Sequence, residues 1–170
     1  MVDLQRIWTE LGIPADYAAG RGLPLQPEAA ELVSIGADNQ NRDCRLAPGA
    51  AQAWRAMQSA ATADGITLCP ISGFRSVERQ AQIFREKLAR GDRLDEILRS
   101  NAAPGYSEHH TGRALDVTDS VAPPLSESFE QTQAFDWLSR HAARFGFHLS
   151  YPRGNSYGFV PEPWHWCWKD

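Results

Sequence analysis

The sequence predicts an α+β domain in which helices flank a small antiparallel sheet. The first observation behind this prediction is the order of the patterns. Helical patterns come mostly first along the chain and strand patterns mostly later, without the regular strand–helix alternation of a parallel sheet. The second is composition, since 42% hydrophobic and 22% charged residues over a length of 170 are typical of a single globular domain with its own core.

We expect one domain over residues 1–170, with an N-terminal extension of helix and loops over 1–45 and a motif-bearing core over 46–168. The extension begins with a helical pattern, because apolar residues recur at the i, i+3, i+4, i+7 spacing between Leu4 and Leu11. The segment that follows contains several prolines and glycines, so we expect loops up to about residue 46.

Within those loops, Pro27 predicts a brief helical turn at 27–30, because proline suits the first position of a helix. Alanines and large apolar residues then share one helical face over 48–64, and Gly65 suits the left-handed cap that ends a helix. The run of β-branched and apolar residues over 66–72 predicts a buried strand.

The rest of the core continues the same mixture. Ser76 suits the N-cap of a helix over 77–90, and a further short helix is expected over 92–100. Apolar spacing then predicts, in order, a strand over 114–118, a helix over 129–145 and strands over 147–151 and 164–168.

Charge and hydropathy exclude several classes of function. With 17 basic and 21 acidic residues the net charge is −4, which gives no electrostatic footprint for nucleic acid. No apolar run approaches the roughly 20 residues that span a bilayer, and the first six residues lack the apolar core of a secretory signal. We therefore expect no nucleic-acid partner, no membrane span and no signal peptide in this chain. We also expect a monomer.

Three segments concentrate polar residues that a core does not need: Ser-Gly-Phe-Arg-Ser-Val-Glu-Arg-Gln at 72–80, Ser-Glu-His-His-Thr-Gly-Arg-Ala-Leu-Asp at 107–116, and Glu-Pro-Trp-His-Trp-Cys at 162–167. His109, Asp116 and His165 would supply the three protein ligands of a catalytic zinc. Glu162 is then left as a base for a water molecule. Spacing alone leaves open the alternative that these histidines only form hydrogen bonds, because no His-Glu-x-x-His motif is present.

The three segments, in this order, resemble the zinc D-alanyl-D-alanine carboxypeptidase family, the VanY-type peptidoglycan peptidases. The family pattern is Ser-Gly-(Phe/Tyr)-Arg-Ser followed by Gln, then Ser-x-His-x-x-Gly-x-x-x-Asp, then Glu-x-Trp-His, and this chain meets it from about residue 46 to 168. The resemblance implies a hedgehog/D-Ala-D-Ala peptidase fold with one Zn²⁺ per chain, bound by His109, Asp116 and His165 in a cleft on the sheet.

The resemblance also implies roles for other residues. Glu162 would be the general base, and Arg75 would stabilise the oxyanion that forms at the scissile carbonyl. Gln80 and Ser107 match positions that contact substrate. The implied reaction is removal of the terminal D-alanine from a peptidoglycan stem peptide or precursor through a zinc-activated water. The implied location is the cell envelope, and action on cytoplasmic precursors stays open because the chain shows no export signal.

Other functions stay open beside this one. They are an L,D-carboxypeptidase or dipeptidase, an endolysin-type peptidase of the same family, and a non-catalytic binding module on the same zinc scaffold, as in hedgehog signalling domains. The presence of both Glu162 and Arg75 favours an enzyme, because a binding module needs neither a base nor an oxyanion partner.

Three neighbours of the implied ligands need separate interpretation. Cys167 stands where relatives usually carry a basic residue, and on a strand it shares a side with His165. We expect a buried free thiol there, since the ligand set is complete without it. His110 is expected to line the pocket or lie at the surface, and Glu108 to be exposed or to support a ligand.

Overall fold

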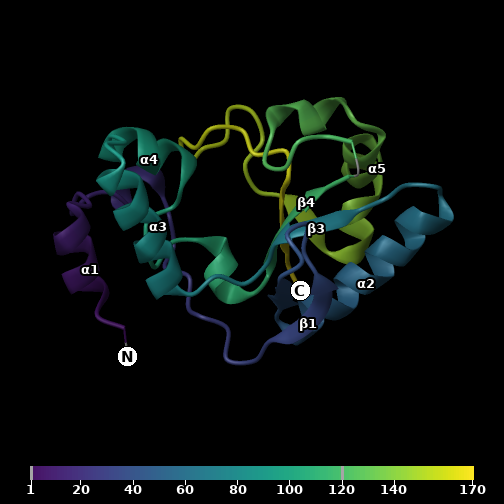
Figure 1. Ribbon diagram of the computed structural model, residues 1–170, viewed down its shortest axis with the longest axis horizontal. Helices are drawn as coiled ribbons and strands as arrows, with labels where there is room; N and C mark the ends of the chain where they lie inside the picture. Colours follow the sequence, from purple (N-terminus) through teal and green to yellow (C-terminus); the bar gives the residue numbers. More distant parts are fainter. Residues whose placement is uncertain (1, 120) are drawn as a thin grey trace.

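The computed structural model describes residues 2–119 and 121–170 and has two sides, one of helices alone and one of sheet and helices (Figure 1). This arrangement confirms the predicted α+β class. One side holds α1 (Leu4–Leu11), α3 (Val77–Ala89) and α4 (Leu94–Ser100), and the other holds the main sheet with α2 (Pro48–Ala63) and α5 (Gln133–His141).

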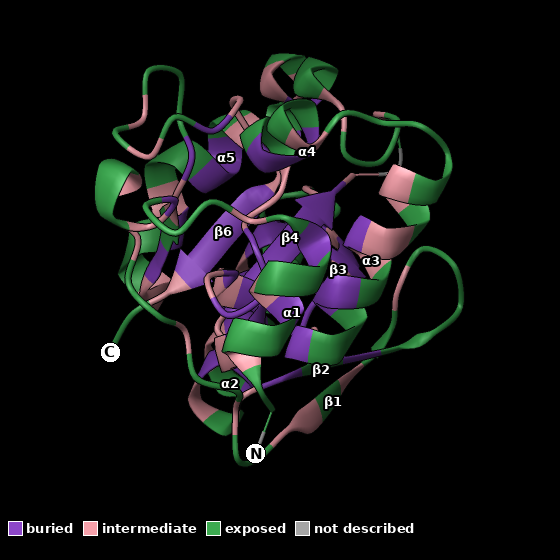
Figure 2. Ribbon diagram, turned by 90° about the vertical axis from the view of Figure 1, so that its left-hand side faces the viewer, coloured by how far each residue is buried: buried purple, intermediate pink, exposed green. Residues whose placement is uncertain are grey.

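Over the described residues, the main sheet is antiparallel with the order β3-β4-β6-β5. The strands are β3 (Cys69–Ser72), β4 (Ala114–Thr118), β5 (Phe147–Leu149) and β6 (His165–Trp168). The central strand β4 is buried along its whole length, as the purple ribbon in Figure 2 shows, because β3 and β6 pair with its two edges and the larger hydrophobic cluster covers the face that carries Leu115 and Val117. A polar side chain on this strand is therefore held in a nearly buried, fixed position.

One row of polar residues crosses this sheet. Ser72 pairs with Asp116 on β4, and Asp116 pairs with His165 on β6. Just after β5, Ser150 donates its backbone N–H to the carbonyl of His165 at 3.4 Å. Antiparallel pairing thus brings together residues that lie up to 93 positions apart, from Ser72 to His165, and the strand spacing sets how far apart they stand.

The prediction of loops up to residue 46 is wrong in part, because β1 (Val33–Ala37) and β2 (Asp43–Leu46) form a hairpin. A bulge interrupts the alternation of inward and outward side chains in β1, since the register shifts between Ser34 and Gly36. The helical turn expected at 27–30 is also absent. A backbone bond from Ala29 N–H to His110 O holds that segment in an open loop instead.

Two further predictions need correction at their ends. The helix expected over 129–145 is divided into α5 and the flanking 3₁₀ turns Glu127–Gln131 and Ala142–Phe145. Thr132 causes the first break, because its hydroxyl accepts the N–H of Phe135 and caps a new helix. The strand expected over 66–72 begins only at Cys69. The predicted cap at Ser76 is confirmed, since its side chain accepts the N–H of Arg79.

Two hydrophobic clusters fill the two sides of the molecule. The larger lies between the sheet, α2 and α5, around the fully buried Trp54, Leu115 and Phe147. The smaller joins α1, α3 and α4 around Phe84, and α1 adds Ile7 to it. The N-terminal extension is therefore part of the packed structure. No helix in the described part of the chain is long and apolar enough to cross a membrane.

Candidate active site

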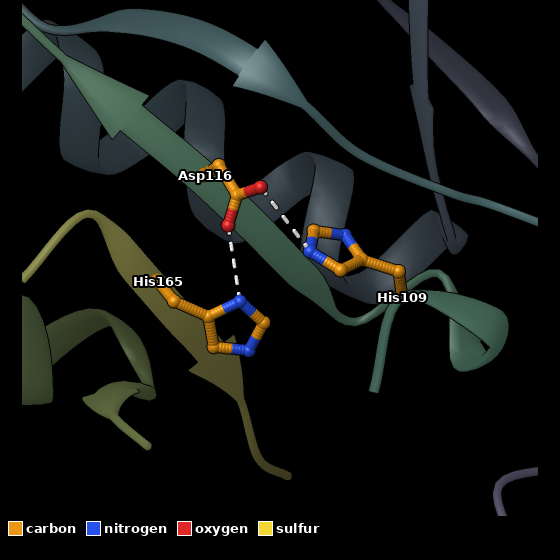
Figure 3. A group of neighbouring side chains, drawn as sticks. All are labelled: His109, Asp116 and His165. Carbon is orange, nitrogen blue, oxygen red and sulfur yellow. Dashed lines mark hydrogen bonds and ion pairs between the residues drawn. The ribbon is translucent and has the colours of Figure 1, made fainter. Parts of the chain in front are cut away.

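The three predicted metal ligands meet at the centre of the sheet (Figure 3). His109 comes from the 3₁₀ turn Glu108–Thr111, Asp116 from the middle of β4 and His165 from the start of β6. All three are buried, and their ligand atoms lie within 4.8 Å of one another. His109 Nε2 is 3.3 Å from Asp116 Oδ2, and His165 Nδ1 is 3.0 Å from Asp116 Oδ1.

Each imidazole is held by a bond on its far side. The Nδ1 of His109 donates to the carbonyl of Gly73 at 2.7 Å, which leaves Nε2 facing Asp116. The Nε2 of His165 donates to Glu108 Oε2 at 2.9 Å, which leaves Nδ1 facing Asp116. Outer bonds of this kind fix which ring nitrogen can bind a metal. Both rings therefore present their ligand nitrogen to the same point.

The charged groups of the ligand cluster are nearly buried, and their pKa values are shifted. Burial opposes ionisation of Asp116, but the two imidazoles hold the pKa of its carboxyl well below the usual range. Although burial disfavours the charged ring, Asp116 and Glu108 raise the pKa of His165 to about 10. A proton on His165 Nδ1 therefore sits where the ring would bind a metal, and metal binding must release it.

The donor set fits zinc. Two imidazole nitrogens and one carboxylate oxygen are the three protein ligands typical of a catalytic zinc site, which keeps one position open. A divalent cation would also pair the carboxylate of Asp116, which is only 4% exposed and would be costly to bury alone. The prediction that His109, Asp116 and His165 lie together is thus matched by the geometry.

The ligands open onto a cleft of about 340 Å³ between the two sides of the molecule. Its other walls come from α3, from the segment after β5 and from the turn before β6. The wall residues include Arg75, Lys87, Tyr151, Phe159, Glu162 and Trp164. The cleft therefore places charged and aromatic groups next to the ligand cluster.

Glu162 stands at the edge of the ligand cluster, with Oε2 at 3.8 Å from His165 Nδ1. Burial is the main cause that raises the pKa of its carboxyl to about 7, with Asp116 acting in the same direction. A carboxylate with such a pKa can both accept and return a proton near neutral pH. These are the properties expected of a general base.

Arg75 is held in one orientation on the opposite wall. Its Nη1 donates to Gln80 Oε1 at 2.9 Å and its Nη2 to Ser72 Oγ at 3.1 Å. Gln80 is only 1% exposed, and its amide nitrogen donates to the carbonyl of Ala102 at 2.7 Å. The structure therefore shows Gln80 as a support for Arg75 as well as a wall of the cleft.

Ser107 also lines the cleft, and it precedes the turn that carries His109. It is buried, and its hydroxyl forms no hydrogen bond within the described residues, so it can bond to a ligand in the cleft. Cys167 lies outside the ligand cluster and is a buried free cysteine, which confirms the expectation of a free thiol. Burial raises the pKa of this thiol, which disfavours the thiolate.

The sequence did not predict what His110 and Glu108 contact. His110 is fully buried and lies neither in the cleft nor at the surface, so that expectation is wrong. Its Nδ1 donates to the carbonyl of Arg75 at 2.6 Å, and its Nε2 accepts the N–H of Gly105 at 3.1 Å. Glu108 supports His165, one of the two alternatives expected for it. The one sequence signal that both residues support the site is that they flank His109 in the motif.

The chain is similar to a known family over most of its length. The family described as D-alanyl-D-alanine carboxypeptidase, VanY, matches residues 43–170. YodJ of Bacillus subtilis (strain 168), which is named as a carboxypeptidase, is 36% identical over 120 residues, or 68% of this chain and 43% of YodJ. The chain thus spans less than half the length of this relative.

Solved structures show the same fold. The LdcB LD-carboxypeptidase has a TM-score of 0.75 and 30% identity, covering 85% of this chain and 71% of LdcB. The vancomycin-resistance D,D-pentapeptidase VanY, solved in complex with Zn(II), has a TM-score of 0.65 and 26% identity, covering 86% of this chain and 82% of that one. The likeness to a zinc complex and the buried His–Asp–His group agree on zinc as the metal of this site.

Proposed function

The chain belongs to the VanY family of D-alanyl-D-alanine carboxypeptidases, and on that premise we propose that it is a zinc peptidase that removes the terminal D-alanine from peptidoglycan stem peptides or their precursors. The observation that carries the proposal is the cleft, which joins a His–Asp–His metal site to a partly buried carboxylate and a fixed guanidinium. Because peptidoglycan is the substrate class, the cell envelope is the proposed place of action.

His109, Asp116 and His165 would hold the metal. A bound zinc supplies Lewis-acid chemistry, because it polarises a carbonyl and lowers the pKa of water. Glu162 takes a proton from the attacking water and later gives it to the leaving amine, since its pKa near 7 allows both transfers. The carboxylate is close enough to the site for this, 3.8 Å from a ligand nitrogen.

Arg75 stabilises the negative charge that develops on the scissile carbonyl oxygen. Two of the five N–H groups of its guanidinium bond to Gln80 and Ser72, so the remaining ones are held in place before substrate arrives. The free hydroxyl of Ser107 is the proposed contact to the terminal D-alanine, and Gln80 acts beside it as the support of Arg75.

The proposed function is tested with zinc-loaded protein and a muramyl pentapeptide, by measuring released D-alanine. We expect Glu162→Gln to bind zinc at one ion per chain and to lose activity by about 10²–10⁴-fold, the usual contribution of a general acid–base. Glu127→Gln is the matched control, because Glu127 is exposed and does not line the cleft. The proposal fails if the zinc-loaded wild type releases no D-alanine. Full activity of the Glu162 variant would remove that residue from the mechanism.

An L,D-carboxypeptidase is the second candidate, and the likeness to LdcB favours it. The two activities differ in the substrate that loses its last residue, a pentapeptide or a tetrapeptide. Mass spectrometry of the products from a mixture of both muropeptides separates them, because each activity shortens a different component. Cleavage of the tetrapeptide alone would select the L,D activity.

A further inference from the structure

Glu108 lies beside a metal ligand in sequence but contacts a different one in space. It precedes His109 on the 3₁₀ turn, and its side chain reaches the far nitrogen of His165 at 2.9 Å. The hydroxyl of Ser150 donates to the same carboxylate oxygen at 2.6 Å. Glu108 lines a separate cavity, together with Cys167 and Arg113, and not the cleft that holds the ligand cluster. Substrate in the cleft therefore does not meet this carboxylate.

Two carboxylates compete for the ring of His165. Asp116 lies 3.0 Å from Nδ1, and Glu108 lies 2.9 Å from Nε2. A neutral imidazole carries one N–H, and only the nitrogen without it can bind a metal. If Glu108 were absent, the hydrogen bond to Asp116 would favour N–H at Nδ1, which is the nitrogen that faces the metal site.

We infer that Glu108 is a positioning residue that selects the metal-binding tautomer and orientation of His165. It holds the N–H at Nε2, so that Nδ1 is free for the metal, and its charge makes the ring a stronger ligand. Ser150 in turn fixes the carboxylate. His109 receives the equivalent support from a backbone carbonyl, that of Gly73, and not from a side chain. Of the two bonds that hold the far sides of the ligand rings, the bond from Glu108 is therefore the one made by a side chain. This inference rests on the proposed zinc site.

The test compares the zinc affinity of Glu108→Ala, Glu108→Gln and Ser150→Ala with that of the wild type, by competition with a chelator. We expect Glu108→Ala to weaken zinc binding by about 10–100-fold, the usual cost of losing an outer partner. Glu108→Gln recovers part of this loss, because its amide oxygen still accepts the N–H of Nε2. Ser150→Ala is the matched control and changes affinity less, since the bond from Glu108 to His165 remains.

A second measurement distinguishes positioning from packing. The ¹H and ¹⁵N shifts of the Nε2–H group of His165 in the zinc-loaded protein report whether this group donates a strong hydrogen bond, and we expect that bond in the wild type and its loss in Glu108→Ala. Wild-type affinity in a folded Glu108→Ala protein overturns the inference, and if that variant does not fold, wild-type affinity in Glu108→Gln does so. A wild type that binds zinc but releases no D-alanine would refute the proposed function and leave this inference standing.

Discussion

Gly73 shows at the scale of one residue how a ligand is placed without contact to the metal. Its carbonyl accepts the Nδ1–H of His109, and its backbone lies against β2. A Cβ at this position would stand 2.5 Å from the carbonyl oxygen of Arg45 and 3.0 Å from the Sγ of Cys44. Only glycine allows the chain to approach the hairpin this closely, so the acceptor for His109 depends on a missing side chain.

Gly73→Ala is therefore expected to weaken zinc binding. The segment must move to relieve the contact with Arg45, which costs about 1–3 kcal/mol as other overpacked sites do and displaces the acceptor of His109. Chemical denaturation and zinc competition measure the two effects. Gly20→Ala is the control, because a Cβ there has nothing within 4 Å. Unchanged zinc affinity in the Gly73 variant would show that the position of this carbonyl is not critical.

At the scale of elements, the N-terminal extension holds the rim of the cleft. Arg21 follows α1 and donates through Nη1 to the carbonyls of Leu98 at 2.9 Å and Tyr157 at 3.4 Å. Its guanidinium also lies over the ring of Phe159, with 5.3 Å to the centroid. Phe159 lines the cleft. One side chain thus joins the end of α4 to the loop that covers the site.

Arg21→Ala is expected to raise KM for the pentapeptide while zinc affinity stays the same. It removes hydrogen bonds and a cation–π contact that together contribute about 1–3 kcal/mol to the order of the rim. A several-fold rise in KM, measured beside zinc competition, is the expected result. Arg6→Ala provides an exposed control from the same extension. If KM stays at the wild-type value, the rim is held by other contacts.

Elements also show what the sequence could predict and where it could not. Strand β4 was predictable over 114–118 because Leu115 and Val117 give a short segment with the apolar and β-branched residues typical of a strand. The β1–β2 hairpin was not, since the bulge at Gly36 breaks the alternation that identifies a strand. Thr132 interrupts a helical pattern through a cap that apolar spacing does not show.

The candidate site divides in the same way. His109, Asp116 and His165 were predictable because the motifs fix residue types and spacing, and the pairing of β4 with β6 brings them together. The contacts of Glu108 and His110 depend on which way two side chains of a short turn point. That direction is set by the surrounding packing, and no periodic pattern in the sequence predicts it.

At the scale of the whole molecule, the metal site joins elements that are distant in sequence. His109, Asp116 and His165 lie on a turn and two strands. Helices α3 and α4, which form the smaller hydrophobic cluster with α1, add wall residues such as Gln80, Lys87 and Ser100 to the cleft. A bound metal would therefore hold the turn and the two strands together in their native arrangement. The unfolded chain does not hold the three ligands within 4.8 Å of one another, so it binds the metal weakly.

Zinc is consequently expected to stabilise the fold. At a free concentration one hundred times the dissociation constant, a ligand specific for the native state adds about 2.7 kcal/mol, which raises Tm by about 5–10 °C for a chain of this size. Calorimetry of chelator-treated and zinc-loaded protein measures the shift. Asp116→Asn is the control variant, because it removes the charged ligand, and its Tm should respond little to zinc. An equal shift in that variant would place the stabilising ion elsewhere.

The row of residues across the main sheet has a consequence for how such chains can change over time. Ser72, Asp116 and His165 share a face because each strand alternates its side chains with a period of two. Removing one residue between Gly112 and Asp116 would turn the carboxylate to the opposite face and separate it from both histidines. Substitutions elsewhere in β4 leave the Asp116 carboxylate on the same face. Insertions and deletions should therefore accumulate in the loops of related proteins, while the length of this strand stays constant.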